Sequence, residues 1–162
     1  MADPIPDKSL REEDKALIGQ LVVWCAGIEQ LAVMALTVSM DAEFESVDLA
    51  FRRMSYAGVL HTLAVLAPTF LPESDLRARW LAWIETAQDI GRRRNEIVHT
   101  LWSSLASEHL EGLRRAPFRE VRMQRDELRK ATHDAGYAMT DGVPLLLDLM
   151  KFRRENQRTR AF

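Results

Sequence analysis

Three residues near the middle of the chain combine types and spacing that could transfer a proton and bind a phosphate: Arg94, Asn95 and His99. Asn95 and His99 are four residues apart, so on a helix both side chains point into the same space. A histidine takes and gives protons near neutral pH, and an arginine fork stabilises charge that builds on a phosphate. These groups suit cleavage of an RNA phosphodiester, whose 2′-hydroxyl is a built-in nucleophile that needs no metal ion.

The segment that carries these residues has a strong helical period, and Arg94 interrupts its apolar stripe. The stripe, with alternating spacings of four and three residues, consists of Leu76, Trp80, Trp83, Ala87, Ile90, Ile97 and Leu101. The same register places Arg94 on the core-facing side, where a guanidinium is costly unless it is paired or opens onto a cleft. Glu29, in the first predicted helix, either faces Arg94 as a supporting residue or lies at the edge of the buried band.

The run Arg94-Asn95-Glu96-Ile97-Val98-His99 resembles the R-x4-H motif of the HEPN superfamily (higher eukaryotes and prokaryotes nucleotide-binding), including the asparagine that often follows the arginine. The resemblance covers roughly one helix closely and the rest of the chain as a helical pattern. It implies an all-helical bundle that dimerises and is often a metal-independent ribonuclease. Some toxins of the family carry a tyrosine two residues after the histidine, which a partner nucleotidyltransferase modifies. Leu101 stands at that position here.

Positive charge is concentrated around and after the motif, although the whole chain has a net charge of −2. Residues 1–91 carry a net charge of −7, and residues 92–162 carry a net charge of +5. The predicted substrate-binding residues are Arg92, Arg93, Arg114, Arg115, Arg119 and Arg122, and Arg125 ends the same run. Exposed arginines are usually only solvated, but their position directly beside the motif favours contact with a phosphate backbone.

The period of the apolar residues predicts an all-α fold, a four-to-five-helix up-and-down bundle. Its main helices are expected near 9–39, 46–67, 73–103 and 124–152. A short hairpin closed by Phe118 to Met123 is an option between the third and fourth helices, because apolar and charged residues alternate there. Gly142 and Pro144 are expected to kink or divide the fourth helix.

The length of 162 residues fits one domain with its own core. The chain is expected to divide into a flexible N-terminal arm at 1–8, a single HEPN-like helical domain at 9–152 and a basic tail at 153–162. The single cysteine, Cys25, leaves no internal disulfide and fits a cytoplasmic location. The apolar run from Leu21 to Met40 is long enough for a membrane span, but Glu29 and Gln30 at its centre argue against one.

Two functions and one structural alternative follow from these patterns. The first is a metal-independent endoribonuclease of toxin or defence type that cleaves single-stranded or loop RNA, with Arg94, Asn95 and His99 as catalytic residues and no cofactor. The second is a non-catalytic HEPN-like dimer that binds a nucleotide, RNA or a protein. In the third, Arg94 is a structural pin bonded to Glu29 and to helix-end carbonyls, in a bundle with no active site. The broad apolar surface of the first helix and the need for a second histidine favour a homodimer, and an antitoxin or defence-system protein is a further expected partner.

Overall fold

The computed structural model describes residues 10–71, 74–103, 109–115 and 118–160 of the chain. These residues form five helices and three short strands. The helices are α1 (Glu12–Met40), α2 (Phe44–Phe51), α3 (Tyr56–Phe70), α4 (Asp75–Val98) and α5 (Arg125–Arg160), and the strands are β1 (Thr100–Ser103), β2 (His109–Arg115) and β3 (Phe118–Gln124). The prediction of an all-α bundle with four to five helices is confirmed. The predicted arm at 1–8 lies outside the described residues.

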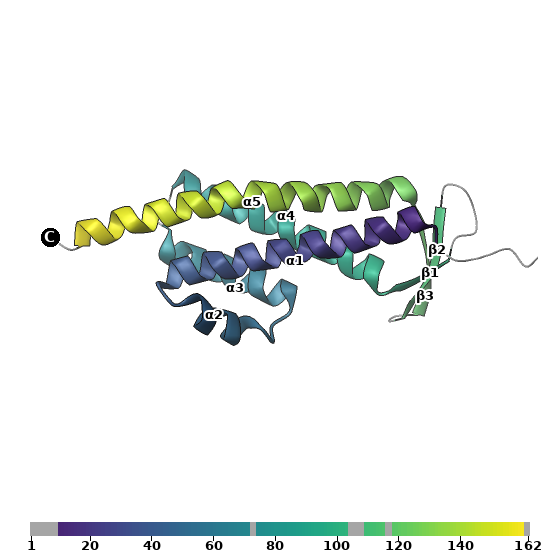
Figure 1. Cartoon of the computed structure of the whole chain (residues 1–162), viewed down its shortest axis with the longest axis horizontal. Helices are drawn as coiled ribbons and strands as arrows, with labels where there is room; N and C mark the ends of the chain where they lie inside the picture. Colours follow the sequence, from purple (N-terminus) through teal and green to yellow (C-terminus); the bar gives the residue numbers. More distant parts are fainter. Residues whose placement is uncertain (1–9, 72–73, 104–108, 116–117, 161–162) are drawn as a thin grey trace, which may run out of the picture.

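The bundle is elongated, and the small sheet closes one of its ends (Figure 1). Helices α1 and α5 lie side by side and begin together next to the sheet, and the C-terminal part of α5 extends past the other helices. The largest fully buried apolar side chains include Trp80, Leu21, Ile28, Leu36, Leu60, Ile84, Ile97, Leu110, Leu128 and Leu149. Full burial of an aliphatic side chain stabilises a fold by roughly 1.5–3 kcal/mol, so this core is the main source of stability.

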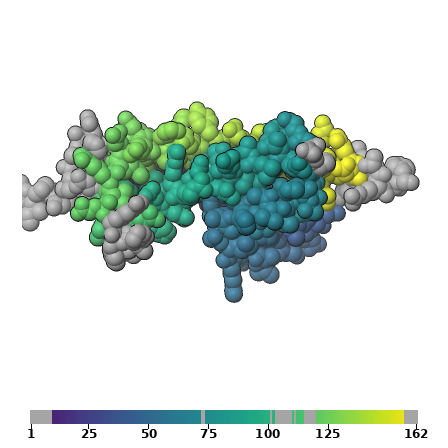
Figure 2. All heavy atoms as spheres, turned by 180° about the vertical axis from the view of Figure 1, so that it is seen from behind, coloured from purple at the N-terminus to yellow at the C-terminus, as the bar shows by residue number. Residues whose placement is uncertain are grey.

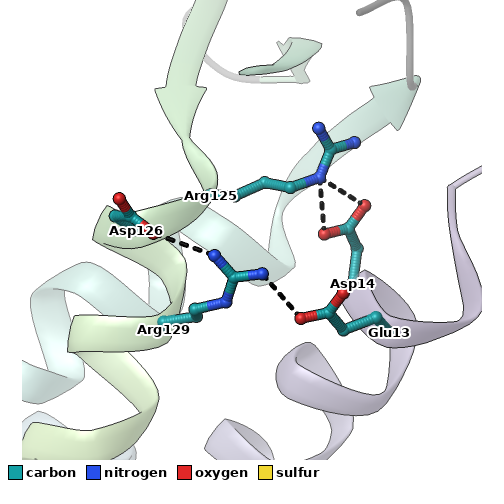
Figure 3. A network of polar contacts seen from close by, with 5 residues as sticks. All are labelled: Glu13, Asp14, Arg125, Asp126 and Arg129. Carbon is teal, nitrogen blue, oxygen red and sulfur yellow. Dashed lines mark hydrogen bonds and ion pairs between the residues drawn. The ribbon is translucent and has the colours of Figure 1, made fainter. Parts of the chain in front are cut away.

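A buried ion pair joins the first turns of α1 and α5 beneath the sheet (Figure 3). Nε of Arg125 donates to both carboxylate oxygens of Asp14, at 3.0 and 3.1 Å. Arg129, one turn further along α5, bridges Glu13 at 2.7 Å and Asp126 at 2.9 Å on the surface. Arg125 is 4 % exposed and Asp14 is 0 % exposed. Arg125, the last arginine of the basic run, therefore serves the fold and is not accessible to a phosphate.

The helix predicted at 46–67 is two helices in the structure. Helix α2 starts at Phe44 and ends at Phe51, and α3 starts at Tyr56 and continues to Phe70. The break arises because Ser55 caps α3: its hydroxyl oxygen accepts a hydrogen bond from the backbone N–H of Gly58 at 3.2 Å. The apolar period continues on both sides of this cap, which is why periodicity alone predicted one helix.

The motif helix was predicted to run to residue 103, and this boundary is wrong. Helix α4 ends at Val98, and residues 100–103 form β1, which pairs with β2 in the register Thr100↔Arg114 to Ser103↔Glu111. Leu101 therefore lies in a strand and not on the helical stripe. The predicted hairpin is present as β2 and β3, whose register begins at Arg115↔Phe118, and β1 makes it an antiparallel sheet of order β1-β2-β3. Pairing with β2, the next strand along the chain, overrides the local helical period here.

Helix α5 is continuous, so Gly142 and Pro144 do not divide it, and it extends beyond the predicted end at 152 to Arg160. Gly142 has a packing role. A Cβ there would lie 2.8 Å from Cδ1 of Leu31 and 2.9 Å from two atoms of Trp83, so its absence lets α1 and α4 approach α5 closely. Trp83 also donates from Nε1 to the backbone oxygen of Ala138 at 2.8 Å.

Helix α1 is the one described helix that is long and apolar enough to cross a membrane. Of its most apolar window, 44 % is buried inside the bundle against the other helices. A core helix of a soluble protein meets the same criteria of length and composition, so this arrangement is compatible with a soluble protein.

Candidate functional site

The sequence motif lies at the C-terminal end of α4, next to the sheet. His99 is the C-cap residue of the helix, with φ −91° and ψ 10°, and its backbone N–H donates to the oxygen of Asn95 at 3.1 Å. The side chains of Asn95 and His99 are both exposed, one turn apart on the outer side of α4. In the described part of the chain no hydrogen bond to the His99 imidazole is present. The ring is therefore open to a substrate or to another chain.

Arg94 is half-buried on the core-facing side of α4, as its register predicts. Its Nη1 donates to Oδ1 of the neighbouring Asn95 at 2.9 Å. Its Nε is buried and has no hydrogen-bond partner among the described residues. The guanidinium therefore bridges from the interior of the bundle to the exposed side of the motif, and Asn95 is the residue that fixes it there.

Helix α3 packs against α4 one turn before Arg94, through Tyr56 and Gly91. The hydroxyl of Tyr56 donates to the backbone oxygen of Ala87 at 2.8 Å. A Cβ at Gly91 would lie 2.3 Å from Cε1 of the Tyr56 ring, so this contact requires glycine. Tyr56 escaped prediction as a site residue because it lies on an apolar helix face. The signal that could have pointed to it was a glycine inside a long helix, which indicates close approach by a neighbour.

Three weakly solvated groups of α1 and α3 lie within the electrostatic influence of Arg94. Burial raises the pKa of the Cys25 thiol to about 11, and the charge of Arg94 partly offsets that rise. Burial likewise raises the pKa of the Glu29 carboxyl and of the Tyr56 hydroxyl above their usual values, again against the charge of Arg94. Glu29 and Arg94 lie in the same region, but no direct ion pair joins them in the described chain.

The arginines predicted to bind substrate are either paired with a carboxylate, exposed, or without a described side chain. Arg92 forms an ion pair with Asp89 on the outer side of α4. Arg93 pairs with Asp134 of α5 at 3.1 Å, and Arg114 of β2 lies 3.6 Å from Glu96. Arg122 of β3 is exposed. The side chains of Arg115 and Arg119 lie outside the described part of the structure. The charges of Arg92, Arg93 and Arg114 are thus partly neutralised by carboxylates. The sequence analysis did not predict these ion pairs.

Comparison with protein-family models, curated proteins and solved structures gives no match. The chemistry and geometry of the motif are therefore the basis for assigning a function. Within the described residues, no three histidine, cysteine, aspartate or glutamate side chains are grouped so that they could hold a metal ion.

Proposed function

We propose that the protein is a metal-independent endoribonuclease of toxin or defence type that acts on single-stranded or loop RNA. The observation that carries the proposal is the position of Arg94. A half-buried guanidinium, held by Asn95 one turn from an exposed histidine, is costly to a core and useful to a reaction that builds negative charge on phosphorus. The resemblance of the motif to that of the HEPN superfamily supports the same assignment.

In the proposed reaction the 2′-hydroxyl attacks the adjacent phosphorus, and the 5′-oxygen of the next nucleotide leaves. One His99 takes the proton of the 2′-hydroxyl, and a second His99 gives a proton to the leaving oxygen. Arg94 holds the non-bridging oxygens while the phosphorus is five-coordinate, and Asn95 fixes its orientation. The products are a 2′,3′-cyclic phosphate and a 5′-hydroxyl, so atoms and protons balance without an added water molecule.

A homodimer would supply the second histidine. Helix α4 extends across the face of the molecule in Figure 2, above α2 and α3. Leu81, which is 38 % exposed, shares a side of α4 with Asn95 and His99 by helical spacing. We propose that this side of α4 forms the two-fold contact, so that both copies of His99 line one groove. In this proposal the protein is cytoplasmic, and an antitoxin or defence-system protein controls it.

One observation favours the alternative, a non-catalytic HEPN-like dimer that binds RNA, a nucleotide or a protein. No described residue orients the His99 ring, and catalytic histidines are usually held by a second group. A substrate or the second subunit would have to provide that contact for catalysis. The binding alternative needs no such contact.

The test is incubation of the purified protein with end-labelled single-stranded RNA in EDTA, with light scattering of the same sample. We expect dimers, undiminished cleavage in EDTA, and 2′,3′-cyclic phosphate ends that resist ligation until they are opened and dephosphorylated. A monomer near 18.6 kDa at micromolar concentration would remove the second histidine. RNA that is bound by the wild-type protein and never cleaved would favour the binding dimer instead.

A further inference from the structure

A cleft of about 420 Å³ lies where the end of α4, β3 and the start of α5 meet. Its floor is apolar. Ile97 is 1 % exposed and Ala131 is 4 % exposed, and Val121 and Met123 are half-buried beside them. Pockets of this size hold small organic ligands, and an apolar floor suits the flat face of a nucleobase.

Three cations surround this floor: Arg93, Arg122 and Lys130. Arg93 and Lys130 share a single carboxylate, that of Asp134, at 3.1 and 2.9 Å. Arg122 is exposed and forms no ion pair within the described chain. Glu96 and Glu127 also line the cleft, and Arg114 lies beside Glu96, so the four cations and three carboxylates at its edge leave a net charge of only about +1. The guanidinium of Arg122 is exposed and can contact a phosphate.

The two carboxylates that line the cleft already have partners. Glu127 accepts a hydrogen bond from the backbone N–H of Gln124 at 2.8 Å, at the start of α5. Glu96 lies 3.6 Å from Arg114 of β2. The charge of Glu96 is therefore partly compensated by Arg114, whereas the hydrogen bond from a neutral N–H leaves the charge of Glu127 at the edge of the cleft. A phosphate would have to lie on the side of Arg122 and Lys130.

The cleft and the motif are neighbours in the sequence, because Ile97, which lines the cleft, lies between Asn95 and His99. It opens on the α5 side of α4, however, whereas Asn95 and His99 lie on the outer side. A single nucleotide cannot occupy both positions. A strand that crosses the end of α4 next to the sheet would reach them with neighbouring nucleotides.

We propose that this cleft binds one unpaired nucleotide of an RNA strand, adjacent to the cleaved bond. Its base lies on Ile97, Val121 and Met123, and its phosphate contacts Arg122 and Lys130. The identity of the ligand as RNA rests on the proposed function. The cleft thereby selects single-stranded over paired RNA, because a base must leave its stack to reach the floor.

The first experiment measures binding of a fluorescein-labelled single-stranded RNA octamer by anisotropy, in a His99→Ala background that cannot cut it. Arg122→Glu and Lys130→Glu are each expected to weaken binding about tenfold or more and to lower the salt slope by about one. Arg52→Glu is the matched control, because Arg52 is exposed and paired with Asp48 four residues away, as Lys130 is with Asp134. It should change affinity less than about twofold. Equal losses of affinity in all three variants would contradict the assignment of this cleft as an RNA-binding site.

The second experiment tests the base with methyl NMR of the same His99→Ala protein. Adenosine monophosphate should shift the methyl signals of Met123 and Ile97, and ribose 5-phosphate should shift them much less. Equal shifts from both ligands would overturn contact between the base and the floor. Displacement of the octamer by hexaglutamate at equal concentration would assign the cleft to an acidic protein partner instead. If the wild-type protein binds the octamer at this cleft and never cleaves RNA, the proposed catalysis fails and the cleft assignment stands.

Discussion

The aromatic ring of Tyr56 lies so close to Gly91 that a Cβ at residue 91 would be 2.3 Å from Cε1 of the ring. The hydroxyl of the same ring donates to Ala87 on the preceding turn of α4, so the ring cannot move away without losing a hydrogen bond. This contact docks the start of α3 onto α4 one turn before Arg94. Arg94 follows on the next turn of α4, and its charge acts on the Tyr56 hydroxyl.

Gly91→Ala is expected to destabilise the protein because the new methyl group would overlap the Tyr56 ring. Overpacking of a well-packed site costs about 1–3 kcal/mol, and urea unfolding followed by circular dichroism measures the loss. Gly19→Ala is the control, since no atom lies within 4 Å of a Cβ at that exposed position of α1. There alanine should stabilise by roughly 0.5–1 kcal/mol. A neutral Gly91→Ala variant would contradict the packing described.

Asp14→Asn is expected to cost about 3 kcal/mol of unfolding free energy, because it removes the buried carboxylate that faces Arg125. Glu13→Gln, which removes the neighbouring exposed partner of Arg129, should cost less than about 1 kcal/mol. Chemical denaturation of both variants gives the comparison. Similar losses in the two variants would mean that burial does not distinguish the two ion pairs.

Cys25 is expected to remain an unreactive thiol in the native protein. Its folded pKa of about 11 lies above the usual thiol value of about 8.5, so folding favours the protonated form. The associated stability is complete below the unfolded pKa and is lost as the pH rises toward about 11. Ellman's reagent near neutral pH should label the native protein slowly and the urea-unfolded protein rapidly. Rapid native labelling, or an unchanged alkaline stability profile in Cys25→Ser, would argue against a buried thiol.

His99→Ala is expected to lower RNA cleavage by about 10²–10⁴ without loss of stability, because the side chain is exposed and supplies a proton-transfer group. Arg94→Ala should lose comparable activity, and Arg94→Lys should recover only part of it because lysine lacks the planar fork. Initial rates on labelled RNA and thermal melts separate chemistry from folding. If Arg94→Ala unfolds the protein and the wild type binds no RNA, the arginine is a structural pin.

The sequence by itself determined the helical class, the core side of α4 and the single charged position on that side. These follow from the period of the apolar residues. Trp80, Trp83, Ala87, Ile90 and Ile97 are buried as that period predicts, and Arg94 interrupts the stripe in the structure as in the sequence. Composition and residue spacing are local properties of the chain, so these inferences do not require knowing which other segments pack against α4.

Tertiary structure alone decided where α4 ends, because β1 forms only when it pairs with β2. It also decided which arginines remain available. Arg125 is buried against Asp14, 111 residues away, and Arg93 is paired with Asp134, 41 residues away. The charge of an arginine is visible in sequence, but its partner is set by the approach of distant elements. The contact of Tyr56 with Gly91 has the same origin, since only the packing of α3 on α4 gives that glycine its role.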